Sequence, residues 1–203
     1  SSHLEAMTLP LPMDSLPPGQ ALGAPPVPGS KSATLRALLL AAQCPGLSRL
    51  RGGLEAEDTR WMREALRGLG VPVLESAAGW EIRGGSRPRA REPLWLGASG
   101  GTLRFLLPWL ALRASEPVSF RGEARLFERP LEPLLRVLEG LGARWESHSE
   151  GGALYPAPVL PDQLDASIEA ALSSQFATGL ALAAAGLPGG GHIRWEWEAA
   201  SRS

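Results

Sequence analysis

The stretch PGSKSATLRALLLAAQ, residues 28–43, predicts the first element of the fold and sets the pattern for the rest. Its apolar residues recur at i, i+3, i+4 and i+7, which places them on one face of a helix. These apolar residues are Leu35, Leu38, Leu39 and Ala42. Pro28-Gly29-Ser30 indicates the start of the helix, and Cys44-Pro45-Gly46 indicates that it ends near residue 43.

The first turn of this helix also carries the polar groups of a candidate anion site. Helix N-termini present free N–H groups and a positive dipole end, and so bind anions. Lys31 lies at that end, and Ser32 and Arg36 are four residues apart and therefore on one face. The alternative is a surface helix that is capped by serine and carries solvated cations.

Lys31 is unusual because it is the only lysine among the 20 lysine and arginine residues of the chain. At a solvated surface position arginine usually serves as well as lysine. A compact ammonium group, in contrast, cannot be replaced by the planar fork of a guanidinium. A chemical need for the point charge of Lys31 is one interpretation, and chance retention is the other.

A Lys-Ser pair near a glycine also suggests a P-loop, the phosphate-binding loop of nucleotide kinases. That loop needs a glycine directly before the Lys-Ser pair, with its first glycine five residues earlier. Here Ser30 precedes Lys31, and no hydrophobic strand ending in an aspartate for magnesium is evident. A P-loop-like kinase is the least favoured of the possible functions.

The pattern of the first helix recurs along the chain. Thr34-Leu35-Arg36 has a counterpart in Thr102-Leu103-Arg104, and a third copy fits residues 173–185. The segment LRGLGV at 66–71 likewise matches LEGLGA at 138–143. Self-similarity with a period of about 70 residues indicates stacked supersecondary units, as in other repeat architectures.

Each unit is predicted to follow the order βαβαββ, which gives the α/β class, and the third unit is incomplete at Ser203. The predicted helices cover about 30–43, 58–69, 100–112, 130–141 and 174–186. The predicted strands cover about 47–50, 71–74, 79–83, 118–121, 144–147, 153–155 and 192–197. Asp58 or Thr59 is expected to cap the second helix. Arg63 and Arg67, four residues apart on that helix, are expected to form a solvated face.

Three further helix starts repeat the polar chemistry of the first. Residues 97–104, GASGGTLR, let a ligand approach the backbone through their glycines. Residues 122–130, GEARLFERP, place two arginines before the next helix, and residues 173–175, SSQ, open the last one. Separately these segments also suit a tight turn, a solvated loop and an N-cap. Together they predict a convergent site for a ligand with several negative groups.

The composition excludes several classes of protein. Apolar residues make up 44% of the 203 residues, which is inconsistent with a disordered chain. The net charge of −1 provides no global basic field for nucleic acid or an anionic membrane. A single cysteine excludes an internal disulfide, and three scattered histidines are too few for a metal site. The apolar stretches 35–42 and 176–187 fall short of the roughly 20 residues of a membrane span.

The motifs PGSKS-x3-RALLLAA, GE-x-R-x3-ERP and SSQF occur in that order, and from Pro28 to Ser203 the chain resembles the 5-enolpyruvylshikimate-3-phosphate (EPSP) synthase family. The resemblance implies an inside-out α/β barrel-like domain of the enolpyruvyl transferases. It implies a transferase that moves an enolpyruvyl group from phosphoenolpyruvate to the 5-hydroxyl of shikimate 3-phosphate, in the biosynthesis of chorismate and aromatic amino acids. It also implies a cytoplasmic enzyme and glyphosate target, without metal or cofactor, that is a monomer at full length.

The resemblance assigns roles to residues by motif position. Lys31 is expected to contact both substrates, and Gln175 to lie between them. The residues expected to bind shikimate 3-phosphate are Lys31, Ser32, Arg36, Ser173, Ser174, Gln175 and Ser201. The residues expected to bind phosphoenolpyruvate are Lys31, Gly101, Arg125 and Gln175.

The family has two similar domains, and the resemblance places the catalytic acid–base residues in the second. Residues 27–203 are therefore expected to be a truncated shikimate-3-phosphate-binding domain that lacks catalytic residues and is inactive alone. Residues 8–26, rich in proline and glycine, are assigned to a leader that belongs with the missing C-terminal domain, and residues 1–7 to an expression-tag scar. The alternative is a non-catalytic anion-binding or interaction module.

Overall fold

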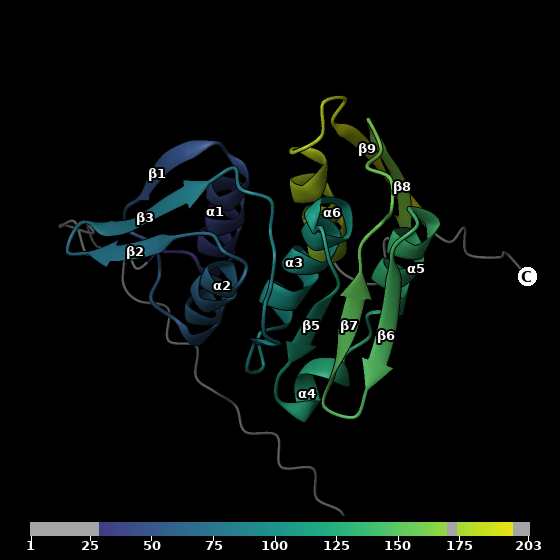
Figure 1. Cartoon of the computed structure of the whole chain (residues 1–203), viewed down its shortest axis with the longest axis horizontal. Helices are drawn as coiled ribbons and strands as arrows, with labels where there is room; N and C mark the ends of the chain where they lie inside the picture. The colour runs from purple at the N-terminus through teal and green to yellow at the C-terminus, as the bar shows by residue number, and fades with distance from the viewer. Residues whose placement is uncertain (1–28, 170–173, 197–203) are drawn as a thin grey trace, which may run out of the picture.

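A computed structural model describes residues 29–169 and 174–196 (Figure 1). Its helices are α1 (Lys31–Gln43), α2 (Glu57–Gly68), α3 (Gly100–Arg113), α4 (Ala124–Phe127), α5 (Glu132–Gly140) and α6 (Ser174–Ala184). Its strands are β1 (Gly46–Leu50), β2 (Val73–Ser76), β3 (Gly79–Gly84), β4 (Leu94–Trp95), β5 (Val118–Arg121), β6 (Arg144–His148), β7 (Gly151–Tyr155), β8 (Leu164–Glu169) and β9 (Gly191–Glu196). None of the helices in these two ranges has the length and apolar character that a membrane span requires.

The strands form three small sheets on the outside of the helices. The first sheet has the order β1-β3-β2 and is antiparallel throughout. The second has the order β4-β5-β7-β6, in which β4 is parallel to β5 and the other pairs are antiparallel. The third is the parallel pair β8-β9. Figure 1 shows α1, α3 and α6 between the first sheet on one side and the other two on the opposite side.

Helix α3 lies at the centre of the core because its sequence is apolar on nearly every face. Leu103, Leu106, Leu107 and Leu110 are completely buried, and so is almost all of Trp109. Helix α3 contacts both α1 and α6, so one apolar helix holds the other two in place.

Helices α3 and α6 run parallel and approach each other closely at a glycine. A Cβ atom on Gly179 of α6 would lie 2.5 Å from the carbonyl oxygen of Arg104 and 3.3 Å from Cγ of Pro108. One turn earlier on both helices, a Cβ on Gly101 would lie 4.0 Å from Nε2 of Gln175. The N-terminal ends of α3 and α6 therefore lie together.

Helix α1 has the same direction as α6. At its C-terminal end, Nε2 of Gln43 donates a hydrogen bond of 3.1 Å to the carbonyl oxygen of Leu182, near the end of α6. In the first half of the helix, Cδ1 of Leu35 lies 3.1 Å from the Cβ position of Gly101 in α3. The first turns of all three helices consequently point to one end of the molecule.

We expect Gly179→Ala to destabilise the protein by about 1–3 kcal/mol, because the added methyl group has no room between α3 and α6. The matched control is Gly140→Ala at the end of α5, where a Cβ would meet nothing within 4 Å. That control should be neutral or stabilising by up to about 1 kcal/mol. Urea unfolding of both variants provides the measurement, and equal stability of the two would contradict the close approach.

Most of the predicted elements are present, but α2 does not start as predicted. Its N-cap residue is Ala56, and Thr59 contributes to the cap from position N3, as half of a capping box. The buried hydroxyl of Thr59 accepts a hydrogen bond from the backbone N–H of Ala56 at 3.0 Å and lies 2.7 Å from the carbonyl oxygen of Leu54. Thr59 therefore stabilises the turn before the helix, and Asp58 is available for other contacts.

The predicted solvated face of α2 is wrong. Arg63 is only 4% exposed, because its guanidinium carbon lies 4.3 Å from the centre of the Trp80 ring. The same guanidinium lies 2.6 Å from Glu55 and 2.7 Å from Glu75. Arg67 pairs with Glu75 at 2.8 Å. Both arginines thus connect α2 to the neighbouring sheet.

Candidate anion-binding site

The first turns of α1, α3 and α6 meet around Gly101. The Cβ position of this glycine lies close to both Leu35 of α1 and Gln175 of α6. The first N–H groups of a helix have no partner within the helix, and its dipole leaves a partial positive charge there. Three such ends in one place create a site that favours negative groups.

Hydrogen bonds and an ion pair link the start of α1 to those of α2 and α3. Nζ of Lys31 lies 3.0 Å from Oδ2 of Asp58, in the first turn of α2. The other carboxylate oxygen of Asp58 accepts a hydrogen bond of 2.6 Å from the hydroxyl of Ser99. Ser99 is also the N-cap of α3, where its oxygen accepts from the backbone N–H of Thr102 at 3.3 Å. Asp58 therefore fixes Lys31 beside the first turn of α3.

A cavity of about 190 Å³ opens beside this ion pair. It is lined by Lys31, Glu57, Asp58, Trp61, Ala98, Ser99, Arg125 and Arg129. The side chain of Lys31 is 52% exposed, so its ammonium group is accessible to a ligand. The volume is below the roughly 300–1,000 Å³ of pockets for whole drug-sized ligands. The cavity therefore suits one small charged group, such as a carboxylate or phosphate.

Two arginine side chains converge above the first residue of α3. A Cβ on Gly100 would lie 3.1 Å from Nη1 of Arg129 and 3.4 Å from Nη1 of Arg104. Neither guanidinium has a carboxylate within 4.0 Å among the residues that the structure describes. Burial of Arg104 lowers its pKa, and the nearby positive charge of Arg129 lowers this pKa further. Two like charges held together in this way favour an anion between or beside them.

The glycine below these arginines is Gly100, and the role of its neighbour Gly101 in binding phosphoenolpyruvate stays a prediction. The Cβ direction of Gly101 faces Leu35 and Gln175, so this glycine provides close contact between helices. Gly100 occupies the position at which a ligand could contact both guanidinium groups and the backbone of α3.

The other predicted residues lie around the same end of the molecule or outside the described residues. Ser32 and Arg36 are half-buried in α1, and Ser174 is exposed at the start of α6. Arg125 lines the cavity but pairs with Glu123 at 3.0 Å. Ser173 and Ser201 belong to the segments that are not described.

Sequence reasoning missed Asp58, Arg104 and Arg129 as site residues. The sequence does indicate Arg104 as a site residue, because the repeat aligns it with Arg36, a predicted ligand. Arg129 stands in the segment 122–130 with Arg125, but the family motif assigns a role to Arg125 alone. The sequence signal of Asp58 is only that of a helix cap.

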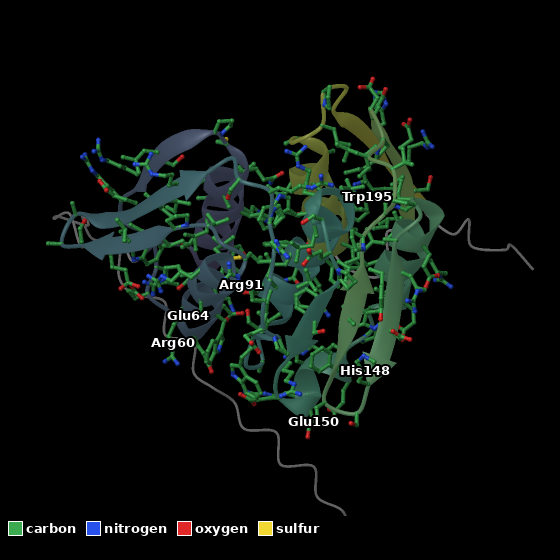
Figure 2. The ribbon with its side chains drawn as sticks, in the orientation of Figure 1. Arg60, Glu64, Arg91, His148, Glu150 and Trp195 are labelled. Atoms are coloured by element: carbon green, nitrogen blue, oxygen red, sulfur yellow. The ribbon has the colours of Figure 1, made fainter. Side chains whose placement is uncertain are left out.

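A larger cavity, of about 700 Å³, lies between α2 and the segment 89–95 that leads into β4. Figure 2 labels three of its lining residues, Arg60, Glu64 and Arg91. Trp61 separates it from the smaller cavity by lining both. Arg67 also lines it, but this arginine already pairs with Glu64 at 2.7 Å. The smaller cavity is lined by Lys31, Glu57 and Ser99 at the starts of α1, α2 and α3, whereas none of these residues lines the larger one, so we take the smaller cavity as the candidate site.

Potential metal ligands do not cluster in the part of the chain that the structure describes. No group of three or more histidine, cysteine, aspartate or glutamate side chains there could hold a metal ion.

Sequence comparison connects this chain to one family. The model of the family EPSP synthase (3-phosphoshikimate 1-carboxyvinyltransferase) matches residues 19–201. The 3-phosphoshikimate 1-carboxyvinyltransferase of Bifidobacterium longum (strain DJO10A) is 38% identical over 177 residues, which cover 82% of this chain and 40% of that protein. The one from Laribacter hongkongensis (strain HLHK9) is 36% identical over 198 residues, covering 94% of this chain and 46% of that protein. The chain thus spans less than half the length of these relatives.

Solved structures show the same similarity in three dimensions. EPSP synthase from Acinetobacter baumannii matches with a TM-score of 0.70 at 26% identity, covering 79% of this chain and 37% of that chain. The enolpyruvyl transferase NikO from Streptomyces tendae matches with a TM-score of 0.56 at 20% identity, covering 77% of this chain and 37% of that chain. The similarity to NikO concerns the fold alone. The chain has a mixed α/β fold similar to that of these proteins.

Proposed function

Because the chain belongs to the EPSP synthase family, we propose that it is the shikimate-3-phosphate-binding part of an enolpyruvyl transferase. The reaction moves an enolpyruvyl group from phosphoenolpyruvate to the 5-hydroxyl of shikimate 3-phosphate and releases phosphate. The observation that carries the proposal is the convergence of three helix starts with Lys31, Arg104 and Arg129 at one end of the molecule.

The charges of the site suit the two substrates. Shikimate 3-phosphate and phosphoenolpyruvate each carry a carboxylate and a phosphate, so four anionic groups must be brought together. Cations and N–H donors that are already in position stabilise such groups without reorganising during the reaction. Lys31, beside the small cavity, supplies a point charge, and Arg129 above Gly100 supplies planar donors for carboxylate or phosphate.

The residue roles follow from the family motifs and from the arrangement of the helix starts. We assign shikimate 3-phosphate to the side of α1 and α6, through Lys31, Ser32, Arg36, Ser173, Ser174, Gln175 and Ser201. We assign phosphoenolpyruvate to the side of α3 and α4, through Lys31, Gly101, Arg125 and Gln175. Gly100 is added to this second set because it lies beneath the two arginines.

The three sheets are proposed to be parts of three βαβαββ units. The order β5-β7-β6 in the second sheet has the same antiparallel arrangement as β1-β3-β2 in the first. Helix α1 precedes β1 in the chain, as α3 precedes β5 and α6 precedes β9. In this view α1, α3 and α6 are equivalent, which explains why all three present their first turns to one site.

The rest of the reaction is assigned to a second domain. The chain covers 40% and 46% of the length of the two relatives described above. General acid–base catalysis requires groups positioned at the reacting atoms, and the family motifs place those groups beyond this segment. We propose that residues 8–26 belong with that second domain, and that the complete enzyme acts in the cytoplasm.

We expect residues 1–203 to bind shikimate 3-phosphate at least about tenfold more tightly than shikimate, because each hydrogen bond to the phosphate adds about 1 kcal/mol or more. Titration calorimetry with both ligands measures the difference. Phosphate release from both substrates should require the complete polypeptide and be absent with residues 1–203 alone.

Two results would contradict the proposed function. Equal affinity for shikimate and shikimate 3-phosphate would remove the phosphate site. A complete polypeptide that is folded but releases no phosphate would remove the reaction.

Arg36→Ala is a useful comparison, because Arg36 lies at the site and has no ion-pair partner among the described residues. It should weaken binding of shikimate 3-phosphate more than that of shikimate.

A further inference from the structure

We propose that Arg104 is a positioning residue that orients the side-chain amide of Gln175, so that its NH2 group faces the anion site. The inference rests on the proposed function. Nη1 of Arg104 donates a hydrogen bond of 2.8 Å to Oε1 of Gln175. This bond joins the first turn of α6 to α3, one turn beyond the start of α3.

Among the described residues, the guanidinium of Arg104 is held by packing and not by a carboxylate. Its central carbon lies 5.3 Å from the centre of the Phe176 ring, and the side chain is half-buried. Its Nε is buried and has no hydrogen-bond partner among the described residues. A buried donor without a partner is unfavourable, so this arginine carries a cost that its other contacts must offset. Among the described residues, the side-chain hydrogen bond that this arginine makes is the one to Gln175.

The hydrogen bond allows only one orientation of the glutamine amide. An amide has one oxygen that accepts and one nitrogen that donates, whereas a guanidinium donates only. Arg104 can therefore bond to Oε1 and never to Nε2 of Gln175. Nε2 is accordingly turned toward α3, 4.0 Å from the Cβ position of Gly101. The amide presents a donor, and not an acceptor, to the end of the molecule where anions are proposed to bind.

Arg129 favours the same arrangement through its positive charge. Its Nη1 lies 3.1 Å from the Cβ position of Gly100, and that of Arg104 lies 3.4 Å from the same point. Two guanidinium groups of like charge repel each other at this range. The repulsion directs Arg104 away from Arg129 and toward the neutral oxygen of Gln175. Arg104 thus acts on the substrate through Gln175, without contacting the reacting atoms.

The test is a double-variant cycle in the complete polypeptide. Arg104→Met and Gln175→Ala should each lower kcat/KM at least about tenfold, and the combined variant should be no worse than Gln175→Ala alone. Arg104→Lys retains a donor and should recover part of the loss. Arg136→Met on the exposed face of α5 is the matched control and should keep the activity of the wild type.

Gln175→Glu separates positioning from stability. The carboxylate still accepts from Arg104, so the melting temperature should not fall. The donor is lost, however, and a negative charge faces the anions, so activity should fall more than in Gln175→Ala. If the hydrogen bond were merely structural, Gln175→Glu would keep both its melting temperature and its activity. Additive losses in the cycle, or wild-type activity in a folded Arg104→Met variant, would overturn the proposal.

A spectroscopic measurement keeps this proposal distinct from the proposed function. In residues 1–203, the side-chain NH2 resonances of Gln175 should report one fixed orientation and should shift and broaden in Arg104→Met. This readout needs no substrate. If the wild type shows no phosphate release while these resonances respond as expected, the proposed function fails and the orienting contact stands. If the resonances do not respond, the positioning role fails.

Discussion

Lys31→Ala should lower kcat/KM of the complete polypeptide by about a hundredfold or more. The ammonium group lies beside the small cavity and is proposed to contact an anion of each substrate. Each charge-assisted contact is worth about 1.5–3 kcal/mol, and about 1.4 kcal/mol corresponds to a factor of ten in rate. The substitution also leaves the Asp58 carboxylate, now 3.0 Å from the ammonium, without its cation. An unpaired carboxylate would repel the substrates.

Three further variants divide this loss into its causes. Lys31→Ala/Asp58→Asn removes the carboxylate charge and should recover part of the activity. Lys31→Arg should fail to restore it, because a planar fork does not reproduce a compact point charge. Arg136→Ala replaces an exposed arginine on α5 and should be near normal. Steady-state kinetics with folding verified by circular dichroism would decide, and near-normal activity of Lys31→Ala would remove Lys31 from the site.

Arg63→Ala should destabilise the protein by about 2–3 kcal/mol, although Arg63 lies outside the site. The change removes the stacking on Trp80 and leaves a hollow beneath α2. Glu55 and Glu75 are 65% and 52% exposed, so water compensates for much of the lost ion pairing. Urea unfolding gives the free energy of unfolding for this variant and for the exposed control Arg91→Ala, which should change it by less than about 0.5 kcal/mol.

Two comparisons test the cause of this loss. Arg63→Met keeps an apolar chain against Trp80 and should recover part of the stability. The pKa of Glu75 lies below its ordinary value of 4.5, chiefly because Arg67 donates a hydrogen bond to it, and the charges of Arg63 and Arg67 lower this pKa further. The stability that the ionised Glu75 adds through these arginines is fully present above pH 4.5, and it is lost as the pH falls through the lowered pKa. The free energy of unfolding of Arg63→Ala should therefore fall less between neutral and acid pH than that of the wild type. An equal fall in both proteins would contradict the role of Arg63.

The helix starts could be predicted because their signals are local. Pro28-Gly29-Ser30 and Cys44-Pro45-Gly46 define α1, which begins at Lys31 and ends at Gln43 as expected. The strand over residues 118–121 was also predicted with the correct bounds. Strand β8 was missed, although Leu164, Ala166 and Ile168 are buried alternately. Its partner is β9, which follows a helix and a turn, so nothing near β8 in the sequence indicates the pairing.

The burial of Arg63 could not be predicted from helix spacing. Spacing places Arg63 and Arg67 on one face of α2, but it does not say what covers that face. The cover is Trp80 of β3, which reaches Arg63 through the antiparallel hairpin of β2 and β3. A cationic side chain with a long apolar stem becomes buried when an aromatic ring is available to it.

The candidate site was predicted as a set of segments, and the structure identifies which residues in them face one another. Gly100 and Gly101 are indistinguishable in the sequence, but their Cβ directions differ by about one third of a helical turn. Only Gly100 lies below Arg104 and Arg129. Asp58 is nearly thirty residues from Lys31 in the chain, and its contact with Lys31 depends on the packing of α2 against α1.

The parallel packing of α1, α3 and α6 has a cost when no anion is present. Three positive dipole ends lie side by side there, which is electrostatically unfavourable, and the apolar contacts along α3 must offset it. This end of the bundle is therefore where amide hydrogens should exchange most readily in the empty protein. A ligand that neutralises the dipole ends would slow that exchange, because binding to the folded state alone stabilises it. Affinity for the ligand and the local rigidity of these first turns are thus two measures of the same free energy.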